Sequence, residues 1–238
     1  MKRFKPLNIL DNKGFWPEKA AVADAIKELL ILGECAKALP VNDFGRYRAP
    51  EWRDENNNLV PWQSVDWYVY DALDEQRMQV DSTRILRDFA SEPWRDEKLY
   101  GDHYDLVMLE EDMYDPAASK DEEQGASYSV GRSQSFTAAV ISTHRIEHIW
   151  GMPYSYIKTE VMRQLCFMFG VPTAGRNDTF TDPTGAVFCT NTCILRPARI
   201  APDDWERLST DRMKHGPLCG SCVEDLRAFF SACAQESS

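Results

Sequence analysis

Several features that would assign the chain to a familiar class are missing from its sequence. No apolar run approaches the roughly 18 residues of a membrane-spanning helix. No apolar signal-peptide core follows the first residues, MKRFKPLNIL, so we expect cytoplasmic residence. Neither a Gly-rich phosphate loop nor a G-x-S-x-G elbow is present, and we find no internal repeat or low-complexity segment.

Basic residues are also too few to balance the acidic ones. The 238 residues include 27 Lys and Arg against 38 Asp and Glu, which gives a net charge of −11. Nucleic acids and anionic membrane surfaces attract proteins with a basic excess, so we expect neither as a partner. With 43% hydrophobic and 27% charged residues, the chain is also neither disordered nor collagen-like, and it is long enough to bury a good core.

The pattern of apolar residues and of Gly and Pro predicts a mixed α/β fold. Long loops are expected over residues 42–64 and 110–127. We interpret the chain as a single domain, 1–238, with an N-terminal α/β subdomain (1–170) and an irregular Cys-rich C-terminal subdomain (171–238). The expected helices cover residues 18–38, 74–89, 156–169 and 223–234, and the expected strands cover 65–70, 104–109, 127–131 and 136–143.

Seven cysteines are present, and four of them form two close pairs. Cys189 and Cys193 are spaced as C-x3-C, Cys219 and Cys222 as C-x2-C, and 25 residues separate the pairs. An odd number of cysteines without a secretion signal argues against a disulfide framework. Two such pairs supply four thiolates at tetrahedral reach, which suits Zn²⁺. The pattern therefore predicts one closed, structural zinc site per chain, with no open position for activating water.

Two other interpretations of these cysteines stay open. In the first interpretation the cysteines are ordinary buried core residues. In the second interpretation Cys219 and Cys222 form a redox pair, although such a pair normally lies between a strand and a helix in a thioredoxin-like unit. Here the preceding segment, STDRMKHGPL, is predicted to form a loop.

An ordered set of segments resembles the archaemetzincins, a metzincin-type zinc peptidase family with a second, structural zinc. The similarity extends from about Gln76 to Leu226. It implies a zincin-like fold with a mixed sheet and flanking helices. The segments that carry it are Arg77-Met78-Gln79, YDLVML followed by Asp112-Met113-Tyr114-Asp115-Pro116, YSVG, AAVISTHRI, KTEVMRQLCFMFG, Asp211-Arg212-Met213-Lys214 and Leu218-Cys219-Gly220-Ser221-Cys222.

The family's catalytic motif, HExxHxxGxxH, is not retained. When the motif is aligned on Gly170, its three metal-binding His positions and its Glu position carry other residues. Arg163, Phe167 and Thr173 replace the His residues, and Gln164 replaces the general base. An arginine stays protonated in proteins, phenylalanine has no donor atom, and glutamine cannot accept the proton. The resemblance thus implies the fold and the structural zinc, but not peptidase activity.

The same alignment shifts the first cysteine pair. The family's first zinc cysteine would fall near Ala174, so Cys189 implies an insertion of about fifteen residues. The family's Met-turn position is occupied by Leu195.

A short histidine motif competes with this interpretation. His144, Glu147 and His148 form an H-x-x-E-H string, the inverted arrangement of some zinc hydrolases. On a helix the two His would bind zinc and Glu147 would act as general base, with Glu160 as a third ligand. The string follows a predicted strand directly, and Gly151 and Pro153 follow soon after, so chance occurrence is the simpler interpretation.

The sequence therefore favours a catalytically inactive metalloprotease homologue that binds a polypeptide or acts as a scaffold, and its oligomeric state is left open. The alternative is an active zinc hydrolase that uses the H-x-x-E-H string. Aromatic residues in the N-terminal half are expected mainly in the core, while a minority could line a groove for a peptide or protein partner. They are Trp52, Trp62, Trp67, Tyr68 and Tyr70.

Overall fold

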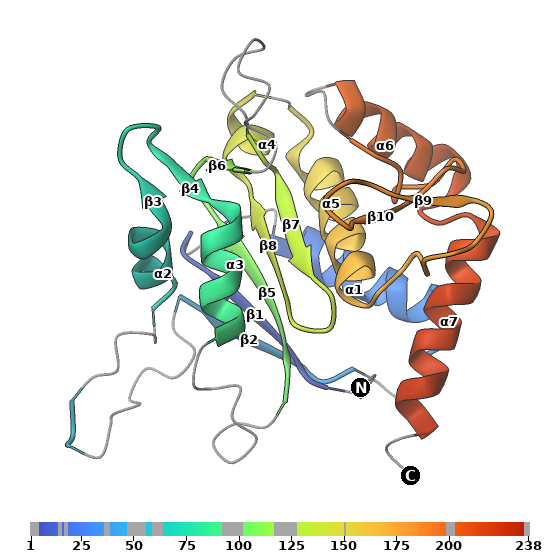
Figure 1. The fold of residues 1–238 in the computed structure, drawn as a ribbon, viewed down its shortest axis with the longest axis horizontal. Helices are drawn as coiled ribbons and strands as arrows, with labels where there is room; N and C mark the ends of the chain where they lie inside the picture. The colour runs from blue at the N-terminus through green and yellow to red at the C-terminus, as the bar shows by residue number, and fades with distance from the viewer. Residues whose placement is uncertain are drawn as a thin grey trace. The chain divides into compact units, whose positions relative to one another are not determined.

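In the computed structural model the chain divides into two compact units. Figure 1 labels the helices and strands of the chain. The sheet unit comprises Lys5–Trp16 and Pro40–Arg145, and the cysteine unit comprises Met1–Phe4, Pro17–Leu39 and Ile146–Ser238. The predicted boundary after residue 170 stays a prediction. The structure describes residues 5–13, 16, 19–35, 39–46, 56–58, 64–91, 102–116, 128–149, 151–198 and 203–235.

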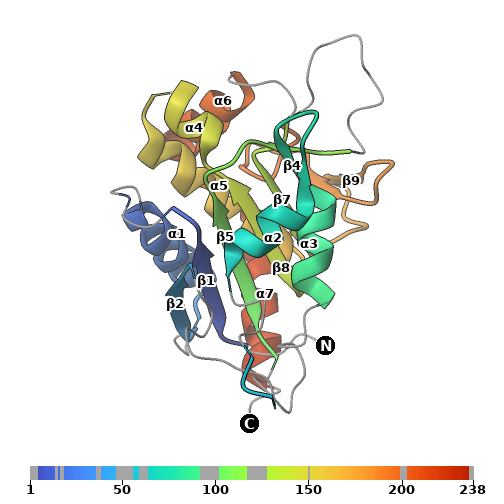
Figure 2. The ribbon, with the colours of Figure 1, turned by 90° about the vertical axis from the view of Figure 1, so that its left-hand side faces the viewer.

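A five-stranded sheet forms the centre of the sheet unit (Figure 2). Its strand order is β2-β1-β5-β8-β7, and every neighbouring pair is parallel except β7 and β8. The sheet is therefore mixed, as expected from the sequence. The strands are β1 (Leu7–Asp11), β2 (Val41–Gly45), β5 (Tyr104–Leu109), β7 (Gly131–Gln134) and β8 (Ala138–Ser142).

Strand β5 lies at the centre of the sheet and agrees with the strand predicted from the sequence. Its six residues are all buried, and it pairs in parallel with β1 on one side and β8 on the other. A strand that is covered on both faces needs a continuous apolar run rather than an alternating one, and YDLVML supplies it. The predicted strand over residues 104–109 is confirmed.

Two helices and the sheet strands share one apolar core. α2 (Val65–Ala72) and α3 (Ser82–Ser91) contribute side chains that pack with Val107, Leu109 and Val140 from the sheet. Tyr68 of α2 stacks on Phe89 of α3, with ring centroids 4.0 Å apart. This stacking joins the two helices over the sheet.

The prediction of a strand over residues 65–70 was wrong, because this segment forms α2. Ser64 caps the helix by accepting a hydrogen bond from the amide of Asp66. The buried residues Val65, Tyr68, Val69 and Ala72 follow helical spacing. The aromatic and β-branched residues of this segment favour a strand. The N-cap and the helical spacing of the buried residues instead stabilise a helix. Trp52 and Trp62 of the predicted aromatic group lie outside the described residues.

The helix predicted over 74–89 begins later than expected. Its first part instead forms a hairpin of β3 (Leu73–Asp74) and β4 (Gln79–Asp81), and α3 starts only at Ser82. Asp74 and Asp81 accept hydrogen bonds from nearby amides, which stabilises a turn and a helix start respectively. β4 also pairs with β6 (Met113–Tyr114), inside the predicted loop 110–127, of which residues 117–127 lie outside the described part.

The described residues of the cysteine unit include four long helices and a hairpin. α1 contacts α5 through an ion pair between Glu28 and Lys158 (2.8 Å). The hairpin of β9 (Thr179–Thr181) and β10 (Val187–Cys189) lies within the insertion inferred from the sequence. The helices are α1 (Lys19–Leu32), α5 (Pro153–Met168), α6 (Asp203–His215) and α7 (Gly220–Gln235), while α4 (His144–Ile149) lies where the two units meet in the sequence.

Helix α5 confirms its prediction. Its end is set by Gly170, whose φ of +77° reverses the chain, while the amide of Val171 bonds back to the carbonyl of Cys166 (2.8 Å). By contrast, the segment STDRMKHGPL was wrongly predicted as a loop, since most of it lies in α6. Acidic residues in the first turn of α6 and basic residues in its last turn suit the helix dipole.

Two other differences are smaller. β2 overlaps the start of the predicted loop 42–64. α1 ends at Leu32 rather than at residue 38, with residues 36–38 outside the described part. Among the described residues, none of the helices is both long and apolar enough to cross a membrane.

Candidate metal centre

Four cysteine sulfurs lie together in the cysteine unit, although they come from two distant stretches of sequence. Cys189 ends β10 and Cys193 lies in the turn after it, whereas Cys219 directly precedes α7 and Cys222 lies in the first turn of that helix. All four Sγ atoms lie within 4.8 Å of one another. In the described part of the chain, no other group of His, Cys, Asp or Glu side chains has metal-binding spacing.

Local backbone hydrogen bonds shape the first cysteine pair. The amide of Cys189 donates to the carbonyl of Leu195 (3.0 Å), and the amide of Arg196 donates to the carbonyl of Cys193 (3.2 Å). The amides of Asn191 and Leu195, each two residues beyond a cysteine, hydrogen-bond the side chains of Cys189 and Cys193. Hydrogen bonds from amides to sulfur favour the thiolate form, which is the form that binds metal.

The second pair lies at the start of a helix. The carbonyl of Cys219 accepts the hydrogen bond from Val223 (3.0 Å) that opens α7. The positive end of the helix dipole therefore faces the sulfurs of this pair and favours their negative charge. The amide of Ile194 donates to the carbonyl of Pro217 (3.0 Å), which joins the two cysteine stretches directly.

The spacing of the sulfurs fits a tetrahedral ion. Four thiolates at about 2.3 Å from a zinc ion lie roughly 3.8 Å from one another. The Cys189 and Cys219 sulfurs are 3.7 Å apart, and no pair exceeds 4.8 Å. Three of the cysteines are buried and Cys219 is half-buried. An arrangement of four soft ligands in a largely dry environment is suited to a closed metal site without a bound water.

The thiols also influence the protonation of one another. The hydrogen bond from the Cys222 thiol lowers the pKa of Cys193 to about 6 and raises the pKa of Cys222 in turn. Burial raises the pKa of Cys189 to about 11. The sulfurs are thus close enough to share protons, and a divalent cation bound between them would replace those protons.

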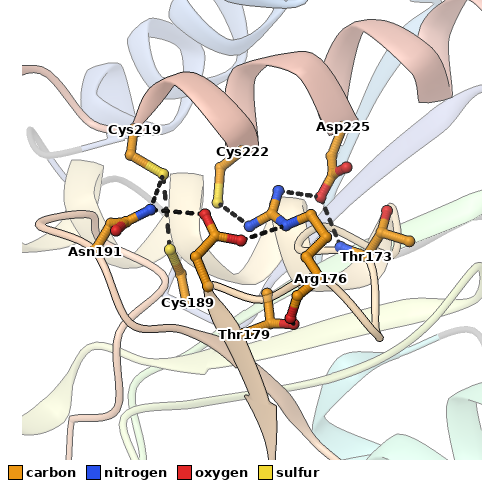
Figure 3. Close-up of polar contacts among 9 residues, drawn as sticks. Thr173, Arg176, Thr179, Cys189, Asn191, Cys219, Cys222 and Asp225 are labelled. Atoms are coloured by element: carbon orange, nitrogen blue, oxygen red, sulfur yellow. Dashed lines mark hydrogen bonds and ion pairs between the residues drawn. The ribbon is translucent and has the colours of Figure 1, made fainter.

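Polar side chains contact two of the sulfurs from outside the cluster (Figure 3). The amide nitrogen Nδ2 of Asn191 lies 3.5 Å from the Cys219 sulfur, and Nη2 of Arg176 lies 3.4 Å from the Cys222 sulfur. Partners of this kind orient metal ligands and adjust their charge.

The residues that the sequence resemblance aligns with the family's catalytic positions all have partners within the protein. Nη1 of Arg163 donates to the carbonyl oxygens of Ile194 (2.6 Å) and Arg196, and the guanidinium also lies over the ring of Phe167. Because Arg163 is only 5% exposed, desolvation lowers its pKa, while the charge of Glu160 opposes that effect.

Gln164 belongs to a buried network with Glu160. Its Nε2 donates to Glu160 Oε1 (2.7 Å), and the indole nitrogen of Trp205 donates to Glu160 Oε2 (3.0 Å). The carboxylate of Glu160 is therefore held by neutral donors, with Arg163 at 3.9 Å.

Phe167 and Thr173 contact the segments that carry the cysteines. The ring of Phe167 meets that of Phe188 edge-on, with centroids 5.7 Å apart, and Phe188 directly precedes Cys189. The amide of Thr173 donates to Asp225 of α7 (2.7 Å).

The H-x-x-E-H string forms the short helix α4. His144 Nδ1 lies 3.3 Å from the carbonyl oxygen of Glu110, and the side chain of His148 lies outside the described part. Within the described part, neither His144 nor Glu147 belongs to a group with metal-binding spacing, and the same is true of Glu160. Metal binding by this string stays a prediction.

The described residues form a mixed α/β fold with a four-cysteine cluster near the C-terminus. A search of solved structures finds archaemetzincin from Methanopyrus kandleri, with 18% sequence identity, 97% of each chain covered and a TM-score of 0.57. Similarity at this level concerns the fold, so the chain is archaemetzincin-like in its fold, as expected from the sequence. No protein-family model and no curated protein sequence matches the chain.

The contacts of Arg176 and Asn191 with the sulfurs were not predicted from the sequence. Arg176 lies 46 positions before Cys222 and Asn191 lies 28 before Cys219, and only the fold brings them together. The one available signal was the position of Asn191 between two cysteines, where a short polar residue readily reaches a neighbouring sulfur or backbone group.

Proposed function

We propose that the protein is a catalytically inactive archaemetzincin-like protein. It holds one structural zinc ion through Cys189, Cys193, Cys219 and Cys222, and it acts by binding a polypeptide or by serving as a scaffold. The observation that carries this proposal is the residue set at the aligned catalytic positions, where no side chain is a metal ligand or a general base.

The chemistry of the cluster supports zinc. Four closely spaced thiols, supported by amide-to-sulfur hydrogen bonds and a helix N-terminus, suit a soft-ligand tetrahedral ion. When bound, the ion would be fully coordinated by sulfur and would join the β10 loop to α7. Such a site supplies folding free energy and no catalysis, because it leaves no position for water or substrate.

The interactions of the substituted residues support the loss of catalysis. Arg163 supports the loop that follows Cys193, Phe167 contacts the ring of Phe188, which precedes Cys189, and the backbone of Thr173 binds α7. The positions that hold catalytic zinc in the family thus contact the segments that hold the cysteine cluster. A catalytic metal at Arg163 would have to displace a buried cation with two carbonyl partners, which is unfavourable.

A binding role has a suitable surface in the sheet unit. β7 ends the strand order of the five-stranded sheet and pairs with β8 on one side, and its residues are partly or fully exposed. Extended polypeptides commonly add to such an edge through main-chain hydrogen bonds. Both a peptide ligand and an extended segment of a protein partner fit such an edge, and either is consistent with the proposal.

The proposal is tested by metal analysis and a peptide-hydrolysis assay on the purified protein. We expect one zinc per chain, lost in Cys219→Ser, and no hydrolysis of unstructured peptides with zinc present. Zinc-dependent hydrolysis that disappears in Gln164→Ala would overturn the proposal.

The alternative function is a zinc hydrolase that uses the H-x-x-E-H string. The observation in its favour is that the string is helical, which places His144 and His148 one turn apart. A second metal per chain that is lost in His148→Ala would support this alternative. Unchanged metal content in the same variant would support the structural site alone.

A further inference from the structure

A continuous line of polar side chains runs around the cysteine cluster and joins two of its sulfurs (Figure 3). Asn191 Nδ2 contacts the Cys219 sulfur (3.5 Å) and also Oδ2 of Asp178 (2.7 Å). The other carboxylate oxygen of Asp178 lies 3.0 Å from Nε of Arg176. Arg176 Nη2 then reaches the Cys222 sulfur (3.4 Å). The line thus begins at one cysteine of the second pair and ends at the other.

Arg176 is the centre of this line because its guanidinium meets three partners in different directions. Besides Asp178 and Cys222, it binds Oδ2 of Asp225 through Nη1 (2.6 Å). Its side chain is 19% exposed. A planar guanidinium can serve three acceptors at once, which the single ammonium of a lysine cannot do with the same geometry.

The charges explain why a cation is needed at this position. Four thiolates around a divalent ion carry a net charge of −2, and Asp178 and Asp225 add −2. Arg176 is the single cation among the side chains drawn in Figure 3. Without it, the cluster and the two carboxylates would repel one another across a few ångströms of partly buried space. An arginine stays protonated in proteins, so Arg176 carries its positive charge.

The position of Arg176 is fixed by its own segment and by α7. Its carbonyl oxygen accepts hydrogen bonds from the hydroxyl and the amide of Thr179 (3.0 and 3.3 Å) at the start of β9. Asp225, which binds Arg176, lies one turn after Cys222 on α7 and also accepts the amide of Thr173. The guanidinium is therefore held between the hairpin and the helix that presents Cys222.

We propose that Arg176 is the positioning residue that governs how tightly the cluster retains its metal, and that Asp178 and Asn191 extend its effect to Cys219. This inference rests on the proposed zinc site and specifies which residues outside the ligand set control it. Arg176 neutralises charge on the thiolates, orients Cys222 and shields its sulfur from solvent and from competing chelators.

The test is the rate at which the purified, zinc-loaded protein releases zinc to an excess of a chromophoric chelator. Arg176→Met should release zinc about 10–100-fold faster, which is the range typical of lost outer partners. Arg176→Lys should fall between Arg176→Met and the parent, because it keeps the charge but not the three contacts. Asn191→Ala, which keeps the arginine, should accelerate release by a smaller factor and serves if Arg176→Met does not fold.

Arg227→Met is the matched control. Arg227 lies on the same helix α7, where its half-exposed side chain binds Glu34 and the carbonyl oxygen of Leu32. We expect it to release zinc at the parent rate. A spectroscopic readout distinguishes a metal effect from a general loss of stability: in the Co²⁺-substituted protein, the thiolate-to-metal absorption should shift in Arg176→Lys and Asn191→Ala but not in Arg227→Met.

Parent-like release from both Arg176→Met and Asn191→Ala would overturn the inference and leave the zinc site intact. Equal release from Arg176→Lys and Arg176→Met would overturn the role of the charge. A parent protein that contains no zinc after purification and takes up none would instead overturn the proposed function itself.

Discussion

The side chain of Arg163 connects helix α5 to the loop that follows Cys193. Its guanidinium binds the carbonyl oxygens of Ile194 and Arg196 and lies over the rings of Phe167 and Phe188. Since Ile194 directly follows Cys193, α5 is attached to the loop that carries half of the cysteine cluster. A residue type that cannot bind a metal cation thus supports the loop of the candidate metal site.

Replacing Gln164 by glutamate, the residue that the sequence resemblance predicts at an active site, should destabilise the protein. Gln164 donates to Glu160 at 2.7 Å, so Gln164→Glu would place two carboxylates in contact at a buried site. We expect the free energy of unfolding at pH 7 to fall by about 2 kcal/mol. The shared proton of such a pair has a higher pKa in the folded state, so the loss should shrink below about pH 5 and grow as the pH rises. Urea unfolding across this pH range measures it.

Gln134→Glu is the control for this prediction. Gln134 is exposed at the end of β7, so the same substitution should change stability by less than about 0.5 kcal/mol at every pH. A Gln164→Glu protein as stable as the parent at pH 7 would contradict the described contact between residues 160 and 164.

At the scale of elements, Asp112 joins three parts of the sheet unit. Its carboxylate accepts hydrogen bonds from Arg145 at the start of α4 (2.9 and 2.6 Å) and from Gln79 of β4 (2.9 Å). Its carbonyl oxygen accepts the amide of Val80 (2.8 Å). Burial opposes the charge, but the hydrogen bonds from Arg145 and Gln79 outweigh it and lower the pKa of Asp112.

This lowered pKa fixes the sign of a pH dependence. A carboxyl whose pKa is lower in the folded state contributes stability above its unfolded pKa, and that contribution is lost as the pH falls through the folded value. Arg145→Met should therefore reduce the free energy of unfolding by about 1–2 kcal/mol at pH 7 and by much less near pH 3. Arg84→Met, which removes an exposed ion pair with Asp71, should change it by less than about 1 kcal/mol. A loss that is independent of pH would contradict the assigned role of Asp112.

The elements also show what local sequence can predict. β5 and α5 were predicted well because a long apolar run and a long apolar stripe with a Gly stop each carry their own signal. α2 and the β3–β4 hairpin were not predicted, because the apolar residues of a short segment fit the periodicity of a helix and of a strand equally well. Capping residues such as Ser64 and Asp81 mark where the helices begin. The cysteine pairs were found from spacing alone, whereas their Arg176 partner depends on the fold.

At the scale of the whole molecule, both units contain buried apolar side chains, and the cysteine unit also contains the four-cysteine cluster. The β10 loop and α7 meet around the four sulfurs, so a bound zinc ion would contribute several kcal/mol to the stability of this unit. Removing zinc with a chelator should therefore loosen the cysteine unit selectively.

Hydrogen exchange measures this effect. After chelation, amides in residues 187–196 and at the start of α7 should lose protection, while those in β5 and β8 should keep it. A zinc-free Cys219→Ser protein should reproduce the same pattern without a chelator. Equal loss of protection in both units, or no change in either, would contradict the placement of the metal.

Elemental analysis of the purified parent protein tests the central claim most directly. We expect one zinc per chain, retained in His144→Ala and His148→Ala and lost when Cys219 and Cys222 are replaced by serine. A second metal per chain that depends on either histidine, or a metal content that is indifferent to the cysteines, would contradict the account.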